Sequence, residues 1–311
     1  MGNILVITGV TGKKSGGAIA QILSNNKEDI LVKFPGGVKA LIRGTSDTSL
    51  LDKLPIHFQK CCGELTNSNF LEDTLKDVDT VLHVAGISLS AYIVDAAVKC
   101  GVRRLILVHT TGIYSKYKTA GENYRITDAY VEKQCKEHGI LLTILHPTMI
   151  YGNVLDNNVI RFVKMVDKLP FMPVVNGANY ALQPVHYMDL AQAYYDVLMN
   201  EASTANRNFN LSGGEEILLR DMLIVMGENL GKKVKFISCP FFIAYAGSWV
   251  LYIFTFGKKD YREKVQRLVE PRVYSHQEAT NAFGYSPRTF RNGIVVEIEE
   301  YKNKKYEGVR K

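Results

Sequence analysis

Short apolar runs alternate with longer amphipathic stretches through the first half of this 311-residue chain. The runs are rich in β-branched residues, whereas the stretches between them have the spacing of helices. The expected strands are Ile4–Thr8, Val38–Arg43, Ile56–Gln59, Thr80–Val84, Leu105–His109 and Leu142–Leu145. The expected helices are Ala18–Leu23, Phe70–Leu75, Ala91–Lys99 and Glu122–Glu137. This alternation predicts βαβ units that build an α/β fold with a doubly wound parallel sheet, its strands buried on both faces.

The alternation loosens after about residue 147, where prolines become frequent. The elements expected here are a strand at Asn208–Leu211 and helices at Asp189–Met199 and Leu218–Leu230, the second helix ended by Gly231. We therefore expect a first domain over residues 1–150 and a smaller, mostly helical lobe over 151–311. Such a lobe can return segments to the first domain.

Composition excludes several classes of protein. Hydrophobic residues make up 46% and charged residues 22%, which is typical of a globular chain and argues against overall disorder. The net charge of +7 favours anionic ligands, but it is spread too widely to indicate nucleic acid. Five cysteines without a C-x-x-C motif argue against a disulfide scaffold and a structural zinc site. With no charged leader before a long apolar region, we expect a cytoplasmic protein.

A glycine-rich loop joins the first expected strand to the first helix. It reads Thr8-Gly9-Val10-Thr11-Gly12-Lys13-Lys14-Ser15-Gly16-Gly17. Glycines let a backbone approach a pyrophosphate, and the helix N-terminus adds free N–H groups. The spacing is one residue longer than the usual G-x-x-G-x-x-G, so Gly12 and Gly16 are either part of a bulged phosphate loop or ordinary turn glycines. We favour dinucleotide binding, because an ATP-type loop requires G-x-x-x-x-G-K-[ST].

Arg43 follows the second expected strand, where NAD sites usually carry Asp or Glu to bind the ribose 2′-hydroxyl. An arginine suits the 2′-phosphate of NADP or stacks on adenine. Arg43 therefore favours NADP slightly over NAD, and the alternative is an ordinary surface arginine.

Several motifs stand in the order found in one enzyme family. They are Thr8–Gly17, Gly63–Thr66, Leu82–Gly86, Gly112–Tyr114, His146–Gly152, Pro184–Ala191 and Asn210–Gly214. Together they resemble the NAD-dependent epimerase/dehydratase family, in the extended and atypical branch of the short-chain dehydrogenase/reductase superfamily. The resemblance covers most of residues 1–230.

The resemblance implies a Rossmann-type NAD(P)-binding first domain and a C-terminal substrate lobe. It implies that the pyrophosphate is held by Gly9, Thr11, Gly12 and Gly16, the adenine is bordered by Glu64 and Leu65, the cofactor cleft is lined by Ala85 and Gly86, and the nicotinamide is approached by Pro147 and Thr148. Family members mostly act on nucleotide-linked sugars, and others reduce sterols, flavonoids or quinones.

The family reaction needs a Tyr for proton exchange, a Lys four residues later that lowers the Tyr pKa, and a Ser or Thr that orients the substrate oxygen. Thr110 stands at the last of these positions. Registering the helix places Tyr124 at the Tyr position but Asp128 at the Lys position, so Tyr-x-x-x-Lys is missing. We take Tyr124 as the candidate acid/base, with the pair Tyr130 and Lys133 as a weaker alternative. Both tyrosines are equally compatible with half-buried helix residues.

Four histidines stand within the motifs. His109 and His146 depart from the usual Ser and Arg of the family, and we interpret His83 as structural. His186 either borders the substrate cleft or caps the helix near Asp189, and we favour the cap. No His, Cys and carboxylate residues have metal-ligand spacing, so we expect no metal site.

Residues 236–257 form an uncharged stretch that is followed by several bases. Its length reaches the threshold of a spanning helix. A core helix or a dimer surface, peripheral membrane contact, and a true span are the three interpretations, in order of preference. The basic C-terminal tail is most simply a solvated helix end.

The sequence therefore predicts a cytoplasmic NAD(P)-dependent enzyme that transfers hydride on a nucleotide-sugar-like substrate. One alternative is a cofactor-binding regulatory or assembly protein without turnover, supported by the missing Lys. Another is a membrane-associated reductase of a lipid-like substrate, supported by residues 236–257. The resemblance also allows a homodimer.

Overall fold

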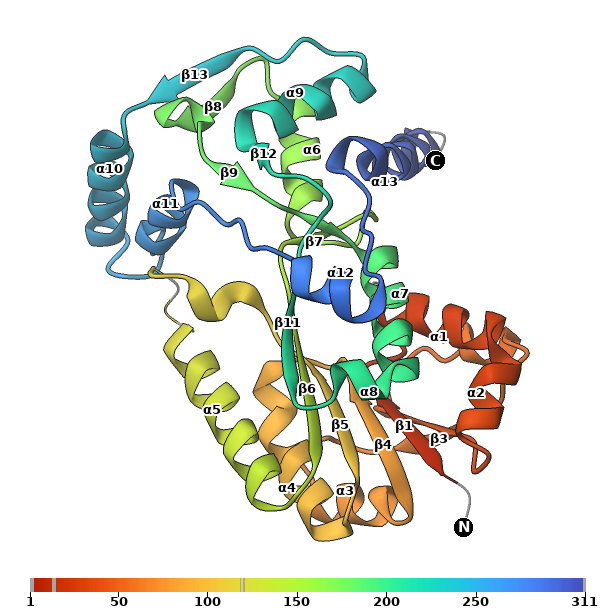
Figure 1. The fold of residues 1–311 in the computed structure, drawn as a ribbon. Helices are drawn as coiled ribbons and strands as arrows, with labels where there is room; N and C mark the ends of the chain where they lie inside the picture. The colour runs from red at the N-terminus through yellow and green to blue at the C-terminus, as the bar shows by residue number, and fades with distance from the viewer. Residues whose placement is uncertain (1–2, 13–14, 118, 120, 310–311) are drawn as a thin grey trace.

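A computed structural model describes residues 3–12, 15–117, 119 and 121–309 (Figure 1). Its centre is a seven-stranded, wholly parallel sheet in the order β11-β6-β5-β4-β1-β2-β3. The strands are β1 (Ile4–Thr8), β2 (Val38–Ile42), β3 (Phe58–Cys62), β4 (Val78–His83), β5 (Arg104–Val108), β6 (Leu141–Pro147) and β11 (Arg207–Leu211). The predicted doubly wound parallel sheet is confirmed. Strand order reverses between β1 and β4, which is where such sheets bind ligands.

Helices cover both faces of the sheet (Figure 1). One face carries α1 (Ser15–Asn25), α2 (Lys27–Lys33) and α7 (Tyr187–Met199), and the other carries α3 (Ser68–Leu75), α4 (Ser90–Cys100) and α5 (Gly121–Glu137). Short 3₁₀ turns follow at η1 (Leu51–Lys53), η2 (Ile87–Leu89) and η3 (Thr111–Tyr114). Because apolar side chains of the strands pack against helices on both sides, the continuous apolar runs of the sequence are explained.

Most expected elements are confirmed with bounds that differ by one to three residues, and two of the strands show what the sequence pattern misplaced. The third strand was expected at Ile56–Gln59 but lies at Phe58–Cys62, where Phe58 pairs with Val38 of β2. Ile56 is buried just before the strand. Its side chain packs in the hydrophobic core, but its backbone is not part of the strand. The fifth strand ends at Val108, one residue early, although the His109 N–H still donates to the Leu145 carbonyl of β6 and the His109 side chain bonds to Asp128 of α5.

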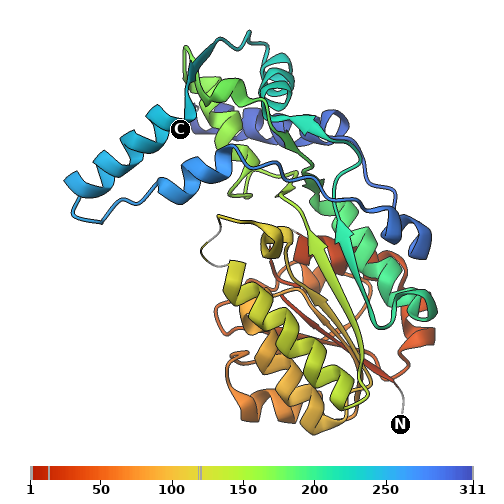
Figure 2. The same cartoon turned by 60° about the vertical axis from the view of Figure 1, so that its left-hand side comes forward.

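A second core lies between α6 (Val159–Lys168), α9 (Leu219–Leu230) and α13 (Phe290–Val309). Three two-stranded ladders accompany it: β7 (Ile150–Tyr151) with β10 (Val185–His186), β8 (Met172–Val175) with β13 (Phe236–Cys239), and β9 (Ala181–Leu182) with β12 (Ile217–Leu218). The remaining elements are η4 (Asn176–Ala178), α8 (Glu201–Thr204), α10 (Phe241–Phe254), α11 (Arg262–Leu268) and α12 (Gln277–Phe283). β11 returns to the central sheet, whereas α10 and α11 project away from the body (Figure 2).

Two expected helix caps are present. Gly231 ends α9 with a left-handed φ of 72°, and its N–H bonds to carbonyls of the last turn. The imidazole of His186 accepts a hydrogen bond from the Met188 N–H at the start of α7. His186 therefore acts as the helix cap that the sequence favoured. Within the described ranges, the helices are all too short or too polar to cross a membrane.

Candidate cofactor and substrate site

The glycine-rich loop runs from the end of β1 into α1. Gly9 has a φ of +73°, and a Cβ there would lie 2.9 Å from the Ala85 N. A Cβ on Gly16 would lie 2.1 Å from the Gly9 carbonyl oxygen. Both positions therefore require glycine, because the helix start is packed directly on the loop. The Gly12 N–H donates to the Gly9 carbonyl at 3.0 Å and closes the turn, while Lys13 and Lys14 lie outside the described residues.

The end of β4 is tied to this loop by a buried histidine. His83 Nδ1 lies 2.7 Å from Thr8 Oγ1, and His83 Nε2 lies 3.0 Å from the Gly86 carbonyl oxygen. The Thr8 hydroxyl also accepts hydrogen bonds from the Val84 and Ala85 N–H groups. Burial lowers the pKa of His83 to about 4, so the ring is neutral at physiological pH. These contacts hold Ala85 and Gly86 beside the glycine loop.

The other residues expected at the cofactor lie at the ends of β2 and β3. Arg43 is exposed, and its backbone N–H donates to Ser46 Oγ at 3.2 Å. Glu64 is exposed just beyond β3, and Leu65 is partly buried against the core. Thr11 and Gly12 line a cavity of about 200 Å³ beside α1. All of these positions lie at the carboxyl edge of the sheet, where a bound dinucleotide would extend.

A larger cavity of about 420 Å³ opens at the ends of β5 and β6. Its lining includes Thr110, Thr111, Pro147, Thr148, Gln183, Arg267 and Arg272. The structure thus brings together Thr110, Pro147 and Thr148, which the resemblance placed around the nicotinamide and the substrate oxygen. The Thr110 hydroxyl already accepts the Gly112 N–H at 3.0 Å, and its proton stays available as a donor.

Two guanidinium groups give this cavity its charge. Arg267 and Arg272 both line it, and the Nε of each is buried without a hydrogen-bond partner among the described residues. Burial lowers the pKa of Arg272, yet an arginine stays protonated at physiological pH. A pair of cations with spare donors suits an anionic ligand such as a phosphate or carboxylate. The sequence analysis missed both arginines because they lie beyond the motifs.

A hydrogen-bonded triad lies buried under the ends of β5 and β6. His109 Nδ1 lies 2.6 Å from Asp128 Oδ1, and His146 Nε2 lies 2.8 Å from Asp128 Oδ2. The second nitrogen of His109 lies 2.8 Å from Ser90 Oγ. Asp128 is thus engaged on both oxygens by His109 and His146, and the sequence resemblance had marked all three residues as departures from the expected pattern. The sequence showed these three residues as separate departures, and that was its one indication of this network.

The triad also corrects the expectation of no metal-ligand cluster. That expectation rested on spacing along the chain, whereas folding brings one ligand atom from each of His109, Asp128 and His146 within 4.8 Å of one another. A metal ion would have to replace both carboxylate hydrogen bonds. In the structure the three side chains instead form a chain of hydrogen bonds that ends at His146 Nδ1, which is buried without a partner among the described residues.

The protonation states in the triad follow from the contacts. Burial alone would raise the pKa of Asp128, but the hydrogen bonds from His109 and His146 outweigh it and lower the pKa to about 2. Burial lowers the pKa of His109 more than the Asp128 carboxylate raises it, so this ring is neutral at physiological pH. Asp128 is therefore the ionised centre of the network.

We expect Asp128→Asn to lower the free energy of unfolding at pH 7 by roughly 2 kcal/mol, because a pKa depressed by about two units stabilises the fold by that amount. A depressed carboxyl pKa stabilises above its unfolded value of 3.8, and the stabilisation is lost as the pH falls from about 4 to about 2. Urea unfolding at pH 7 and pH 3 should show the difference between variant and parent shrinking with acid. Asp73→Asn, at an exposed pair with Lys76, is the control; equal effects of the two changes would refute the assignment.

The two tyrosine candidates lie differently on α5. Tyr124 is half-buried one turn before Asp128, on the same helix face. It is not among the residues that line the larger cavity. Tyr130 is exposed, and its hydroxyl bonds to the Asp95 carboxylate, which raises the pKa of Tyr130 to about 12. Tyr130 therefore ties α5 to α4 and is the weaker candidate.

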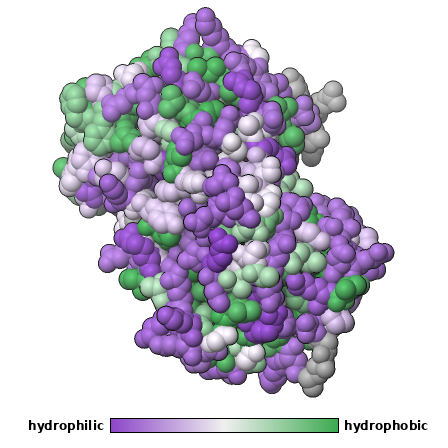
Figure 3. All heavy atoms as spheres, in the orientation of Figure 1, coloured by the Kyte–Doolittle hydropathy of each residue, from purple (hydrophilic) through white to green (hydrophobic). Residues whose placement is uncertain are grey.

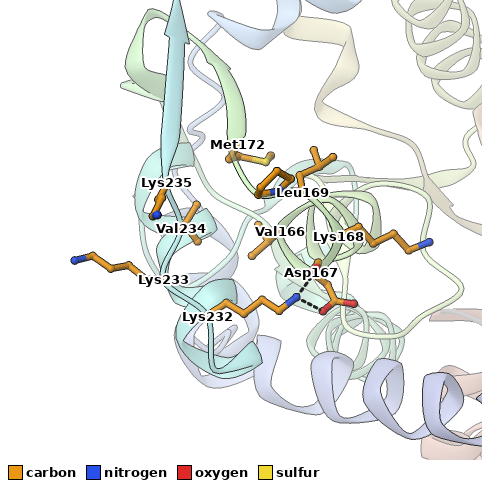
Figure 4. Close-up of a pocket in the computed structure, with 10 residues that line it drawn as sticks. Val166, Asp167, Lys168, Leu169, Met172, Lys232, Lys233, Val234 and Lys235 are labelled. Atoms are coloured by element: carbon orange, nitrogen blue, oxygen red, sulfur yellow. Dashed lines mark hydrogen bonds and ion pairs between the residues drawn. The ribbon is translucent and has the colours of Figure 1, made fainter.

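Another cavity of about 410 Å³ lies in the C-terminal lobe between α6 and the start of β13 (Figure 4). Lysines surround it, but its carboxylate is fully engaged. Asp167 accepts hydrogen bonds from Lys232 Nζ at 2.8 Å, Lys305 Nζ at 2.6 Å and the Tyr301 hydroxyl at 2.8 Å. These bonds fasten α13 and the end of α9 to α6, so we interpret this cavity as structural.

Known proteins are similar to this chain mainly in their fold. No protein-family model matches the chain. The mitochondrial NADH dehydrogenase [ubiquinone] 1 alpha subcomplex subunit 9 of Arabidopsis thaliana is 25% identical over 104 residues, which are 33% of this chain. The match spans about a quarter of that relative's length, 26%.

Solved structures align over almost the whole chain. A UDP-glucose 4-epimerase of Thermotoga maritima, solved with UDP-glucose, covers 97% of this chain and 99% of its own at a TM-score of 0.70 and 16% identity. The dTDP-glucose 4,6-dehydratase DesIV of Streptomyces venezuelae, solved with NAD, covers 96% and 97% at a TM-score of 0.71 and 16% identity. At this identity the likeness concerns the backbone alone. The protein therefore shares the fold of sugar-nucleotide epimerases and dehydratases over nearly its full length.

Proposed function

We propose that the chain is an NAD(P)-dependent oxidoreductase or epimerase of the epimerase/dehydratase family, acting on an anionic, nucleotide-sugar-like substrate. The observation that carries the proposal is the glycine cradle at the switch point of the sheet. Gly9 and Gly16 leave no room for side chains, which is the requirement for a backbone that approaches a pyrophosphate. In this proposal residues 1–150 bind the dinucleotide, and residues 151–311 complete the substrate site with side chains such as Gln183, Arg267 and Arg272.

The dinucleotide would be held along the carboxyl edge of the sheet. Gly9, Thr11, Gly12 and Gly16 would hold its pyrophosphate, Glu64 and Leu65 would border its adenine, and Ala85, Gly86, Pro147 and Thr148 would line its cleft. When bound, the nicotinamide supplies the hydride-transfer chemistry.

The chain's own residues would place the substrate and move its proton. Thr110 keeps its hydroxyl proton free to orient a substrate oxygen, while Arg267 and Arg272 attract the anionic part of the substrate into the same cavity. Tyr124 would exchange the proton. The triad centred on Asp128 ties α5 to the ends of β5 and β6. In the proposal this tie would position Tyr124 in place of a lysine.

A fluorescence titration with NADH and NADPH tests the proposal directly. We expect saturable binding of at least one of them. The comparison structure with a bound dinucleotide contains NAD, so NADP is supported here by Arg43 alone. Arg43→Asp should weaken NADPH more than NADH if Arg43 contacts a 2′-phosphate. Binding of neither dinucleotide would overturn the proposal.

Once a substrate is found among UDP- and dTDP-linked sugars, Tyr124→Phe should lower turnover by about a hundredfold, the scale of lost general acid–base catalysis. The NADH affinity should stay nearly constant, because the phenol is proposed to face the substrate. Tyr130→Phe is the control and should leave turnover within about twofold. Unchanged turnover in the Tyr124 variant would remove this residue from the mechanism.

A further inference from the structure

The hairpin of α10 and α11 exposes an apolar helix to solvent. Of the 14 residues of α10, Ser248 is the one buried residue. The exposed fractions reach 70% at Phe242, 63% at Ile253 and 79% at Phe254, and Phe256 beyond the helix end is 92% exposed. Figure 2 shows the hairpin standing away from the body of the molecule, and Figure 3 shows apolar residues on the same side. We propose that this hairpin docks the protein on an anionic lipid surface.

The distribution of apolar side chains around α10 favours lipid over a protein groove. At about 100° per residue, its exposed apolar side chains spread over about 200° of the helix circumference, with the remaining side turned to α11. A helix that packs on a protein needs a stripe of about half that width. Acyl chains can surround such a helix from several directions at once, whereas a single protein face covers one side.

The length of α10 makes the contact peripheral. Fourteen residues at about 1.5 Å each span about 21 Å, less than the roughly 30 Å of a bilayer core. The helix can enter one leaflet but does not cross it, which agrees with the lack of a spanning helix in the described part of the chain.

Charge and aromatic rings identify the surface as an anionic membrane interface. The tip after α10 carries Lys258 and Lys259, which form no ion pair with described residues. Arg262 lies 4.2 Å above the Trp249 ring and 4.0 Å above the Tyr252 ring and is paired with Asp260, so the net positive charge of the tip comes from Lys258 and Lys259 beside an aromatic cluster. Tryptophan, tyrosine and flanking bases are the composition of interfacial anchors on anionic leaflets.

The hairpin is also joined to the larger cavity. Glu263 of α11 accepts a hydrogen bond from Thr119 at 2.6 Å, and Glu270 accepts one from Ser115 at 2.7 Å, both on the segment that precedes α5. Arg267 of the same helix lines the cavity. Docking would therefore hold the cavity mouth close to the lipid surface. The docking itself does not depend on the proposed function.

Trp249 is the single tryptophan of the chain and lies on α10, so it reports on the contact without a label. The full-length protein is mixed with phosphatidylcholine vesicles that contain or lack phosphatidylglycerol, and flotation is measured beside tryptophan emission. We expect flotation and a blue shift of the emission with the anionic vesicles. Brominated lipids should quench Trp249, because its ring would lie at the acyl boundary.

Matched variants separate this contact from unspecific adhesion. Phe254→Ser with Phe256→Ser should lower vesicle partition at least about tenfold, because two exposed rings leave the bilayer. Val32→Ser, at a residue of α2 that is 83% exposed, should leave partition unchanged. Lys258→Gln with Lys259→Gln should weaken binding to the anionic vesicles about tenfold and leave the neutral ones unaffected.

Two results would overturn the proposal. One is a protein that stays in the unbound fraction with unchanged Trp249 emission at every vesicle composition. The other is concentration-dependent dimerisation in sedimentation equilibrium that the Phe254 and Phe256 changes abolish while vesicles stay unbound. That second result would assign the hairpin to a second copy of the chain.

Discussion

Replacement of Gly16 by alanine is expected to lower the NADH affinity by at least about a hundredfold, since its backbone packs on the phosphate loop. A Cβ at this position would lie 2.1 Å from the Gly9 carbonyl oxygen, far inside contact distance. Either the glycine loop or the start of α1 must move to make room for this Cβ. Because both are proposed to form the pyrophosphate site, either movement would weaken binding. A fluorescence titration of the variant against the parent measures the loss.

Gly247→Ala is the control for this experiment, because a Cβ there has no atom within 4 Å. Should the Gly16 variant fail to fold, Gly12→Asp replaces it. Gly12 is exposed, and an aspartate there places a carboxylate where the phosphates would bind, without burying it. Parent-like affinity in both variants would show that the loop does not bind the dinucleotide.

Arg104→Met is expected to lower the free energy of unfolding by roughly 3–5 kcal/mol, the scale of removing one partner from a buried charged network. The guanidinium is fully buried on β5. Its Nη atoms donate to the carbonyls of Val197 and Leu198 at 2.7 and 2.9 Å, and to Thr204 Oγ1 at 3.0 Å. Without the guanidinium, the last carbonyls of α7 are left buried and unsatisfied.

Urea unfolding of the adjacent Arg103→Met variant provides a matched control. Arg103 is exposed and pairs with Asp79 and Glu201, so its loss should cost no more than about 1 kcal/mol. Burial lowers the pKa of Arg104 to about 10, which leaves it charged at pH 7, so methionine removes a cation and not a neutral base. Equal effects of the two variants would contradict the role given to Arg104.

Local sequence patterns were sufficient to predict that the chain forms a parallel central sheet. Runs such as Ile4–Thr8 are apolar at every position because both faces of the strand are covered, and that requirement is visible without any tertiary contact. The glycines at two turns could also be interpreted from the sequence, since Gly9 and Gly231 have positive φ angles that favour glycine. Strand boundaries were less certain. Ile56 is buried like a strand residue but precedes the strand, because burial and pairing leave the same apolar signal.

The residues that line the larger cavity could not be predicted from the sequence. Arg267 comes from α11 of the hairpin and Arg272 from the segment after it, both more than a hundred residues from Thr110 and Thr148. The way the C-terminal lobe folds back brings these arginines to the cavity. The residues next to each arginine in the sequence do not indicate this contact. The core helix that was among the preferred interpretations of residues 236–257 is wrong, since α10 is exposed. The sequence could not show this, because an apolar helix has the same sequence whether it lies in a core or on the surface.

The sequence by itself determined the order of strands and helices along the chain and the glycine-rich loop between the first strand and the first helix. Each of these depends on residues that are neighbours in the chain. Only the tertiary structure decided that His109, Asp128 and His146 form one network, and that Arg104 is a buried anchor and Arg103 a surface residue. The physical reason is that parallel strands place residues dozens of positions apart at one edge of the sheet, so hydrogen-bond partners there are fixed by strand order and register.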